Sequence, residues 1–308
     1  MIGKKMNEIN LDEKINLENN IKETQTTQKN PPHPKTTTIK EKKQIGKKEG
    51  KKKQKRQKQY LEKRDLLLMV FCYEQYFLVR NQMLNWLMAK YDFKNAGSAD
   101  IAMRRILGIL KRLNLVNISR SGFLDYREIF VINERGVRAL KDKGYLPEYA
   151  VNIDLDETKL SHDYMTTEVR LILEKVINCK EWVSDRLLRC KNHLNIPDAE
   201  ITYFSPKANR DAKISVEVEM TQKSKERYKK KLTDYQKSHY DLLFYFANQE
   251  SIKEAILGES KGITQMAYIC LIDELLTKQQ KVTMVSNDDE LVLGERFQTP
   301  INSLERGL

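Results

Sequence analysis

The chain has 308 residues, enough for two compact domains and a tail, and it carries 55 Lys and Arg against 43 Asp and Glu. The formal net charge of +12 favours a polyanionic partner such as nucleic acid or an anionic membrane surface. No apolar run reaches the length of a spanning helix and no signal-peptide core is found, so we expect a cytoplasmic protein without membrane insertion.

Residues 1–58 are predicted to form a disordered basic tail. They are rich in polar residues and nearly devoid of aromatic ones, so they cannot bury enough apolar surface to offset the entropy lost on folding. Residues 1–64 contain 19 basic and 8 acidic residues, which places most of the net charge there. Residues 40–58 are dense enough in cations to bind a nucleic-acid backbone by counterion release, and a solubilising spacer is the alternative.

Residues 59–150 are predicted to form a domain that begins with three helices. The first helix ends near Tyr73, the second spans residues 81–88, and the third begins with Ser98 as its N-cap. Two alternating segments, VNIS and REIFVIN, then predict a β-hairpin that turns at residues 121–122, and ERGVRALKDKG predicts a closing helix. The apolar face of the third helix is expected to contain Ile101, Ile106, Ile109, Leu110 and Leu113.

This order of elements resembles the winged-helix branch of the helix-turn-helix family over residues 62–147. The resemblance implies that the third helix enters the major groove of double-stranded DNA and that the hairpin contacts the backbone. A solvated basic surface, or a winged helix that binds protein, is the alternative. The candidate DNA-binding residues on the third helix and the hairpin are Arg104, Arg105, Lys111, Arg112, Arg120 and Arg127.

Residues 158–275 are predicted to form an α/β domain, separated from the first by an acidic linker at residues 151–158. A helix over HDYMTTEVRLILEKVIN opens it, and residues 276–308 are interpreted as a hairpin or a loosely held C-terminus. Strand-like runs follow at 182–190, 196–204, 212–220, 240–247 and 266–273, with helical stretches at 223–238 and 250–258. The fold class is therefore α+β, a winged helix followed by an α/β domain with a mixed central sheet.

Two segments of this second domain, IPDAEITYF and KISVEVEMTQK, carry the candidate chemistry. Side chains alternate along a strand, so Glu217 and Glu219 share one face while the apolar residues between them enter the core. If the neighbouring strand presents Asp198 beside them, three hard oxygen ligands converge. Such a set suits Mg²⁺ or Mn²⁺ better than zinc.

These segments resemble the PD-(D/E)xK signature of restriction-endonuclease-like nucleases. The resemblance implies that Asp198, Glu217 and Glu219 are metal ligands in a catalytic site. The Lys of the signature is replaced here by Glu219, and Lys223, four residues further on, is the candidate to lie next to the scissile phosphate. A site that relies on the metal alone is the alternative.

Two residues of the preceding helix are further catalytic candidates. Glu168 resembles the extra acidic residue that many such nucleases supply from their first core helix, and an exposed surface residue is the equal alternative. His162 is a candidate phosphate contact or auxiliary ligand, whereas a lone His near a helix start is otherwise a cap or a packing residue.

The combination of these motifs over residues 62–250 resembles the MOBC-class plasmid mobilisation relaxases and the related replication-relaxation proteins. It implies strand nicking at a transfer or replication origin, with other relaxosome or replication proteins as partners. The alternatives are a non-catalytic DNA-binding regulator with a degenerate nuclease-like domain, and a restriction-like endonuclease. The histidines are scattered and form no HxH cluster, which disfavours the histidine-triplet and tyrosine mechanism of most other relaxases.

The Lys-rich segment KERYKKKLTDYQKS has two features of interest. Tyr228 and Tyr235 share a helical face and are expected to pack against the sheet, with a nucleophilic or DNA-stacking role as the alternative. The lysines of this helix are candidates to follow a phosphate backbone, namely Lys229, Lys230, Lys231 and Lys237.

The remaining motifs exclude several activities. Cys72, Cys179, Cys190 and Cys270 are far apart and form no CxxC pair, so we expect buried free thiols and neither disulfides nor a zinc knuckle. GxxxxGK[ST] and HExxH motifs are absent, which disfavours NTP hydrolysis and zinc proteolysis.

Overall fold

A computed structural model describes residues 60–124, 127–151, 155–190, 196–206, 208–262 and 266–297. These residues all belong to one unit that begins at Gln57. The predicted basic tail at residues 1–58 and the last residues, 298–308, lie outside the described residues. We refer below to residues 60–151 as the N-terminal portion and to residues 155–297 as the C-terminal portion.

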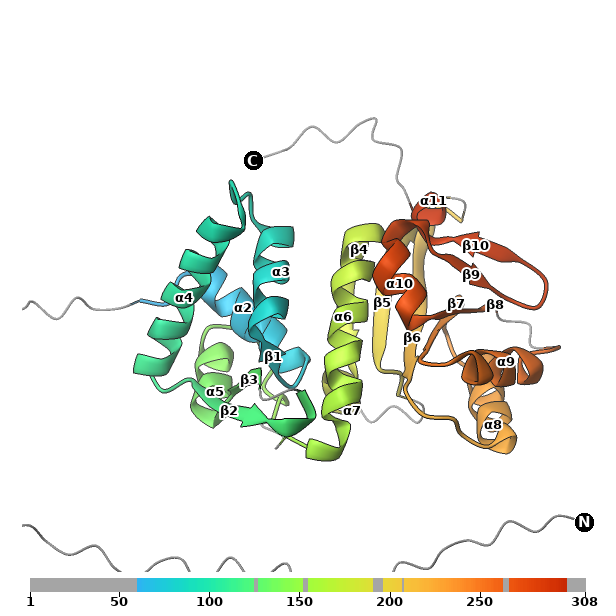
Figure 1. Ribbon diagram of the computed structural model, residues 1–308, viewed down its shortest axis with the longest axis horizontal. Helices are drawn as coiled ribbons and strands as arrows, with labels where there is room; N and C mark the ends of the chain where they lie inside the picture. Colours follow the sequence, from blue (N-terminus) through green and yellow to red (C-terminus); the bar gives the residue numbers. More distant parts are fainter. Residues whose placement is uncertain are drawn as a thin grey trace, which may run out of the picture. The chain divides into compact units, whose positions relative to one another are not determined.

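The N-terminal portion packs helices against a small antiparallel sheet (Figure 1). Its strands are β1 (Leu78–Val79), β2 (Val116–Ser121) and β3 (Arg127–Ile132), in the order β1-β3-β2, and the short η1 (Gly122–Leu124) follows β2. Its helices are α2 (Lys63–Glu74), α3 (Arg80–Lys90), α4 (Ala96–Arg112) and α5 (Glu134–Asp142). This is the order of helices, hairpin and closing helix that the sequence predicts, with the short strand β1 added.

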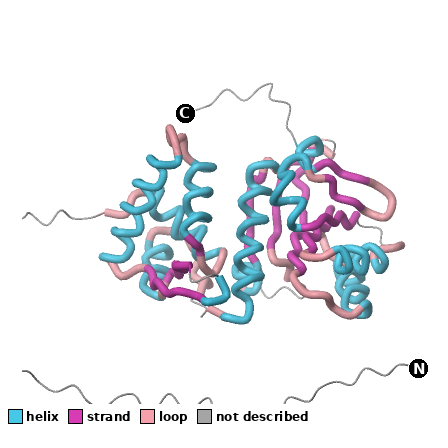
Figure 2. Tube along the Cα trace, in the orientation of Figure 1, coloured by secondary structure: helices cyan, strands magenta, loops and turns pink. Residues whose placement is uncertain are grey.

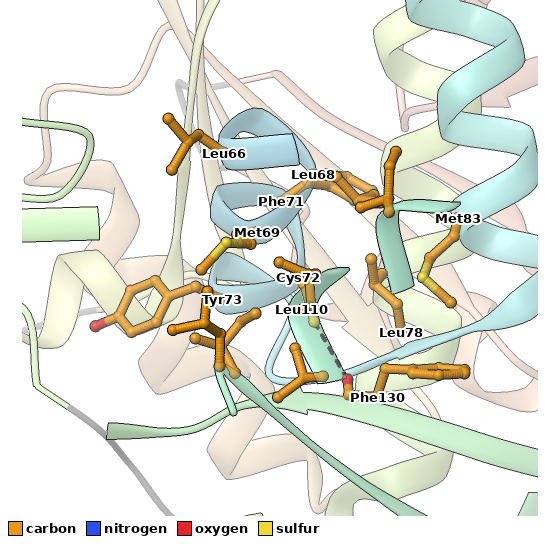
Figure 3. Close-up of a cluster of buried hydrophobic side chains, with 14 of the residues drawn as sticks. Leu66, Leu68, Met69, Phe71, Cys72, Tyr73, Leu78, Met83, Leu110 and Phe130 are labelled. Carbon is orange, nitrogen blue, oxygen red and sulfur yellow. Dashed lines mark hydrogen bonds between the residues drawn. The ribbon is translucent and has the colours of Figure 1, made fainter. Parts of the chain in front are cut away.

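The core of the N-terminal portion is centred on α2 (Figure 3). The run LLLMVFCYE is apolar around most of the helix, and eight residues of α2 are buried. The thiol of Cys72 donates a hydrogen bond to the carbonyl oxygen of Phe130 in β3, with sulfur and oxygen 3.2 Å apart. Helix α2 is therefore held by apolar packing on several sides and by one polar contact to the sheet.

The structure corrects two predictions for α4. The N-cap is Asn95 and not Ser98, because the Asn95 side chain accepts a hydrogen bond from the Ser98 amide and the Ser98 side chain bonds back in a capping box. Ile101 is 71% exposed, so it does not belong to the apolar face. Met103, one position before the exposed Arg104, is buried there instead.

The C-terminal portion contains a mixed seven-stranded sheet (Figure 2). The strand order is β10-β9-β8-β7-β6-β5-β4, in which β6, β7 and β8 are parallel and the remaining neighbours are antiparallel. The strands are β4 (Cys179–Ser184), β5 (Ala199–Ser205), β6 (Arg210–Glu219), β7 (Leu242–Ala247), β8 (Met266–Leu271), β9 (Thr283–Val285) and β10 (Glu290–Val292).

Helices cover both faces of this sheet (Figure 1). One face packs against α6 (Leu160–Val176), α10 (Ile272–Lys278) and α11 (Leu293–Phe297), and the other against α8 (Lys225–Gln236) and α9 (Glu250–Glu259). Short helical turns are found at α7 (Asp185–Arg189), η2 (Glu157–Lys159) and η3 (Gln279–Lys281). Alternation along β6 sends Val216 and Val218 towards α6 and leaves Glu217 and Glu219 on the α8 side, as predicted.

Three predicted boundaries in the C-terminal portion are wrong. The expected strand at 182–190 ends at Ser184 and continues as α7, because the sequence DRLLR has good helix formers and an acidic first turn. Pro197–Asp198 lies directly before β5 and not within it. The C-terminal hairpin is formed by β9 and β10, but β9 pairs with β8 and so extends the sheet beyond residue 275.

The last two residues of α2 and the two that follow it connect the two portions. The carbonyl oxygen of Tyr73 accepts a hydrogen bond from Arg186, and the carboxylate of Glu74 pairs with Arg170. The Gln75 side chain accepts one from Thr167, and the Tyr76 hydroxyl donates one to Asp185. The four residues that bond to the end of α2 belong to α6 and α7. The N-terminal portion is therefore attached directly to the helices that flank β4 and β5.

The cysteines are free, but only two are buried. Burial raises the pKa of the Cys72 and Cys270 thiols to about 12. Cys179 and Cys190 are half-buried, which corrects the expectation that all four are buried.

Candidate functional site

The pairing of β5 with β6 brings the predicted carboxylates together. The antiparallel register pairs Ala199 with Val216, so Asp198, one residue earlier, lies across from Glu217. The Asp198 carboxylate accepts a hydrogen bond from the Val218 amide, with oxygen and nitrogen 2.7 Å apart. The start of β5 and the end of β6 therefore form one acidic edge of the sheet.

Glu217 and Glu219 are almost fully buried, at 2% and 1% exposure, and each is held by a lysine. The Lys231 ammonium lies 2.5 Å from Oε2 of Glu217 and 3.9 Å from Oε1 of Glu219. Lys223 donates to Oε1 of Glu219 at 2.6 Å, and the Tyr235 hydroxyl donates to Oε1 of Glu217. The two carboxylates thus lie beneath α8, between the sheet and two cations.

His162, in the first turn of α6, approaches the same edge from the other side. Its Nε2 lies 3.3 Å from Oδ2 of Asp198 and its Nδ1 lies 3.2 Å from Oδ1 of Asp163. Burial opposes the charged imidazolium, but the hydrogen bonds and charges of the two aspartates raise the pKa of His162 to about 10. His162 is therefore a protonated partner of Asp198 at neutral pH.

These residues line a single cleft of about 530 Å³. It contains five of the six predicted catalytic residues, namely His162, Asp198, Glu217, Glu219 and Lys223. The volume is in the range of small-ligand pockets and accommodates a nucleotide-sized group. The structure thus places these five side chains in one cleft.

Glu168 is not brought to this cleft. Its carboxylate accepts a hydrogen bond from Nε2 of Gln82 in α3, at 3.0 Å. Burial raises its pKa, and it does not line the cleft. Glu168 is therefore placed at the contact between α6 and the N-terminal portion and away from the other candidates.

Three further cleft residues were not predicted as site residues. Lys231 was predicted only as one of the lysines that could follow a phosphate backbone, yet it points inward to Glu217. Asp185 and Tyr76 also line the cleft, with the Tyr76 hydroxyl 3.0 Å from Oδ2 of Asp185. Tyr76 has a φ of 65°, a left-handed conformation that is uncommon for a residue other than glycine. Nothing in the local sequence indicates that the end of α2 reaches this cleft.

The charges of the site nearly compensate one another. Burial raises the pKa of Glu217 to about 7, against the opposing effect of the Lys231 ammonium. For Asp198, burial is outweighed by the hydrogen bond and charge of His162, and the pKa is lowered. Burial is likewise outweighed for Lys231, where the neighbouring carboxylates raise the pKa. Asp198 and Lys231 are consequently both charged at neutral pH.

The donor set suits a divalent cation by its chemistry, because the carboxylates of Asp198, Glu217 and Glu219 offer hard oxygen ligands at one edge. The geometry is not that of a formed ligand set. Within the described ranges, no three His, Cys, Asp or Glu side chains meet as a group that could hold a metal ion. A neighbouring cation holds each of the three carboxylates, so these ion pairs have to open before a metal can bind.

The predicted DNA-binding residues form a separate exposed group on the N-terminal portion. Arg104 pairs with Asp100 and Arg105 with Glu62, both at 2.6 Å. Such exposed ion pairs contribute little to stability and open readily for a stronger anion. All six candidates are exposed and lie on α4, β2 and β3, namely Arg104, Arg105, Lys111, Arg112, Arg120 and Arg127. Arg127 also donates a hydrogen bond to the Tyr164 hydroxyl of α6 at 3.2 Å.

Comparisons with protein-family models, with curated proteins and with solved structures find no match to this chain. Among the described residues, no helix combines the length and apolar character needed to cross a membrane.

Proposed function

We propose that this protein is a metal-dependent DNA-nicking enzyme of the relaxase type, which cleaves one strand at a plasmid or conjugative-element origin. One observation carries the proposal: Asp198, Glu217 and Glu219 line one cleft that also contains Lys223 and Lys231. Carboxylates that bind a cation, next to lysines that neutralise phosphate charge, are the groups required for hydrolysis or transfer of a phosphodiester. The resemblance to the PD-(D/E)xK signature points to the same chemistry.

The residues of the cleft have distinct roles in this proposal. A Mg²⁺ or Mn²⁺ ion bound by Asp198, Glu217 and Glu219 would polarise the scissile phosphate and acidify a bound water. Lys231 moves from Glu217 to the phosphate and compensates its negative charge. Lys223 donates a hydrogen bond to a second oxygen of the same phosphate. His162 is a positioning residue, because its hydrogen bond fixes the orientation of the Asp198 carboxylate.

The N-terminal portion supplies DNA recognition in this proposal. It is taken as a winged helix whose α4 lies in the major groove of origin DNA, while β2 and β3 contact the phosphate backbone. Supporting this, Arg104, Arg105, Lys111 and Arg112 are exposed on one helix. Other relaxosome or replication proteins are the proposed partners.

A second candidate function is a DNA-binding regulator whose C-terminal portion is a non-catalytic docking platform. The ion pairs at the site favour this candidate, since they stabilise the buried carboxylates without a metal. The two candidates differ in one property: only the enzyme opens these pairs to bind a cation.

Nicking of supercoiled plasmid tests the first candidate. The plasmid carries the DNA that flanks this gene, and the readout is conversion to the open circular form with Mg²⁺ or Mn²⁺ and with EDTA. We expect nicking that requires metal and that falls by about 10²-fold or more in Glu217→Ala, because the loss of one charge-stabilising group has effects of this size. Glu254→Ala, which removes an exposed carboxylate of α9, is expected to nick as the wild type does.

Other outcomes decide against the proposal. An intact plasmid at every metal concentration, or equal nicking by Glu217→Ala, would favour the docking platform. Linear product from plasmids of any sequence would instead indicate a restriction-like endonuclease.

A further inference from the structure

Helix α8 has an outer surface with an excess of cations. Its inner face, Tyr228, Leu232 and Tyr235, is buried against the sheet, which confirms the packing role predicted for the two tyrosines. The outer cations of the helix and the residue after it are exposed and form no ion pair with any described residue, namely Lys225, Arg227, Lys229, Lys230 and Lys237.

Several other exposed cations of the protein have a carboxylate partner. Arg80, Arg104 and Arg210 are also exposed, but each is paired with a carboxylate. On α8 several cations lie three or four residues apart, and they outnumber the two carboxylates of the helix, Glu226 and Asp234. A surface with such an excess of positive charge suits an external polyanion.

The outer surface leads into the cleft. Lys231 and Lys223 line the cleft from α8 and from the chain just before it. Arg227 lies one helical turn before Lys231 and three residues before Lys230. Arg227 is therefore a neighbour of both lysines on the helix surface. The exposed cations of α8 are therefore close along the helix to the two lysines that contact the buried carboxylates.

We propose that the exposed side of α8 is a binding surface for the phosphodiester backbone of DNA, and that it guides a strand into the cleft. The lysines act as mobile point charges, and Arg227 offers a planar fork for phosphate oxygens. The proposal rests on the proposed function only for what happens inside the cleft. Binding along α8 requires neither a metal nor cleavage.

The test measures DNA binding by the full-length protein in EDTA, by fluorescence anisotropy of a labelled DNA over a range of salt concentrations. The variant Arg227→Gln with Lys230→Gln removes two exposed cations, and Lys143→Gln with Lys281→Gln is the matched control. Each lost phosphate contact lowers the slope of log affinity against log salt by about 0.7–0.9. We expect the α8 variant to lower it by about 1.5 and the control to leave it unchanged.

A single strand, a duplex of the same sequence and polyglutamate are compared as ligands. A phosphate-binding surface is supported if the salt slope of the α8 variant is lower than that of the wild type with either DNA but not with polyglutamate. An unchanged slope in the α8 variant, an equal loss in the control, or an equal loss with polyglutamate overturns the proposal. EDTA prevents cleavage, so this test is independent of the nicking assay. If the α8 variant lowers the salt slope but the wild type does not nick plasmid, the result counts against the proposed function alone.

Discussion

Replacement of Lys231 by methionine is expected to slow metal-dependent nicking by about 10²–10³-fold and, at the same time, to strengthen Mn²⁺ binding. The ammonium of Lys231 lies 2.5 Å from Oε2 of Glu217, so it competes with a metal for that oxygen. Its removal frees the carboxylate for the metal. Under the proposed function it also removes the cation that compensates phosphate charge during cleavage, and the loss of one such group has an effect of this size.

Slower nicking together with stronger Mn²⁺ binding distinguishes this role of Lys231 from a purely structural one, which would weaken both. Mn²⁺ affinity is measured by electron paramagnetic resonance and the nicking rate under single-turnover conditions, with thermal melting to verify the fold. Lys281→Met removes an exposed cation of η3, away from the cleft and from α8, and is expected to change neither quantity. A Lys231→Met protein that nicks at the wild-type rate, or that binds Mn²⁺ more weakly, would contradict the role assigned to Lys231.

Replacement of Arg170 by alanine is expected to lower the free energy of unfolding by about 3–5 kcal/mol, the usual effect of removing one partner from a buried ion pair. Arg170 is 7% exposed, and it lies 2.6 Å from Glu74 and 2.7 Å from Glu174. Its guanidinium also lies over the rings of Phe71 and Trp182, at 4.6 and 5.1 Å. The alanine variant leaves the buried Glu74 carboxylate without its cation.

Denaturant unfolding of the variant and two controls tests this. Arg138→Ala removes an exposed pair with Glu134 and is expected to cost at most about 0.5 kcal/mol. The double variant Arg170→Met with Glu74→Leu replaces the pair by apolar side chains and is expected to recover most of the stability. A loss below about 1 kcal/mol in Arg170→Ala would mean that this network does not hold α2 against α6.

The sequence predicts the part of the site that depends on local rules. Alternation along β6 is enough to place Glu217 and Glu219 on the same side of the sheet. The position of Asp198 beside them follows from the resemblance to a known signature and from the pairing of consecutive strands. Helix α8 and its buried tyrosines follow from spacing alone.

The remainder of the site depends on tertiary packing. Whether Lys231 points outward or under the helix is decided by the rotation of α8 about its axis, which Tyr228 and Tyr235 fix by packing against the sheet. Tyr76 reaches the cleft only because the end of α2 lies against α7, a contact between residues more than 100 positions apart. Glu168 has the expected position in α6 but faces the N-terminal portion, a difference that the order of elements does not specify.

The reversed prediction for residues 185–190 has a local cause. An apolar pair between basic residues, as in DRLLR, is compatible with a buried strand or with a short amphipathic helix. In the structure Asp185 begins α7, and its carboxylate is thereby turned towards Tyr76 and Arg189 at the cleft. A boundary error of a few residues thus concealed a residue of the site.

Binding of Mn²⁺ to the full-length protein tests the cation pocket most directly, since it depends on neither a DNA sequence nor a reaction. Our account predicts binding by the wild type, loss of binding in folded Asp198→Asn and Glu217→Gln, and unchanged binding in Glu254→Gln. A folded wild-type protein that binds no Mn²⁺, or an Asp198→Asn variant that binds it as tightly as the wild type, would contradict it.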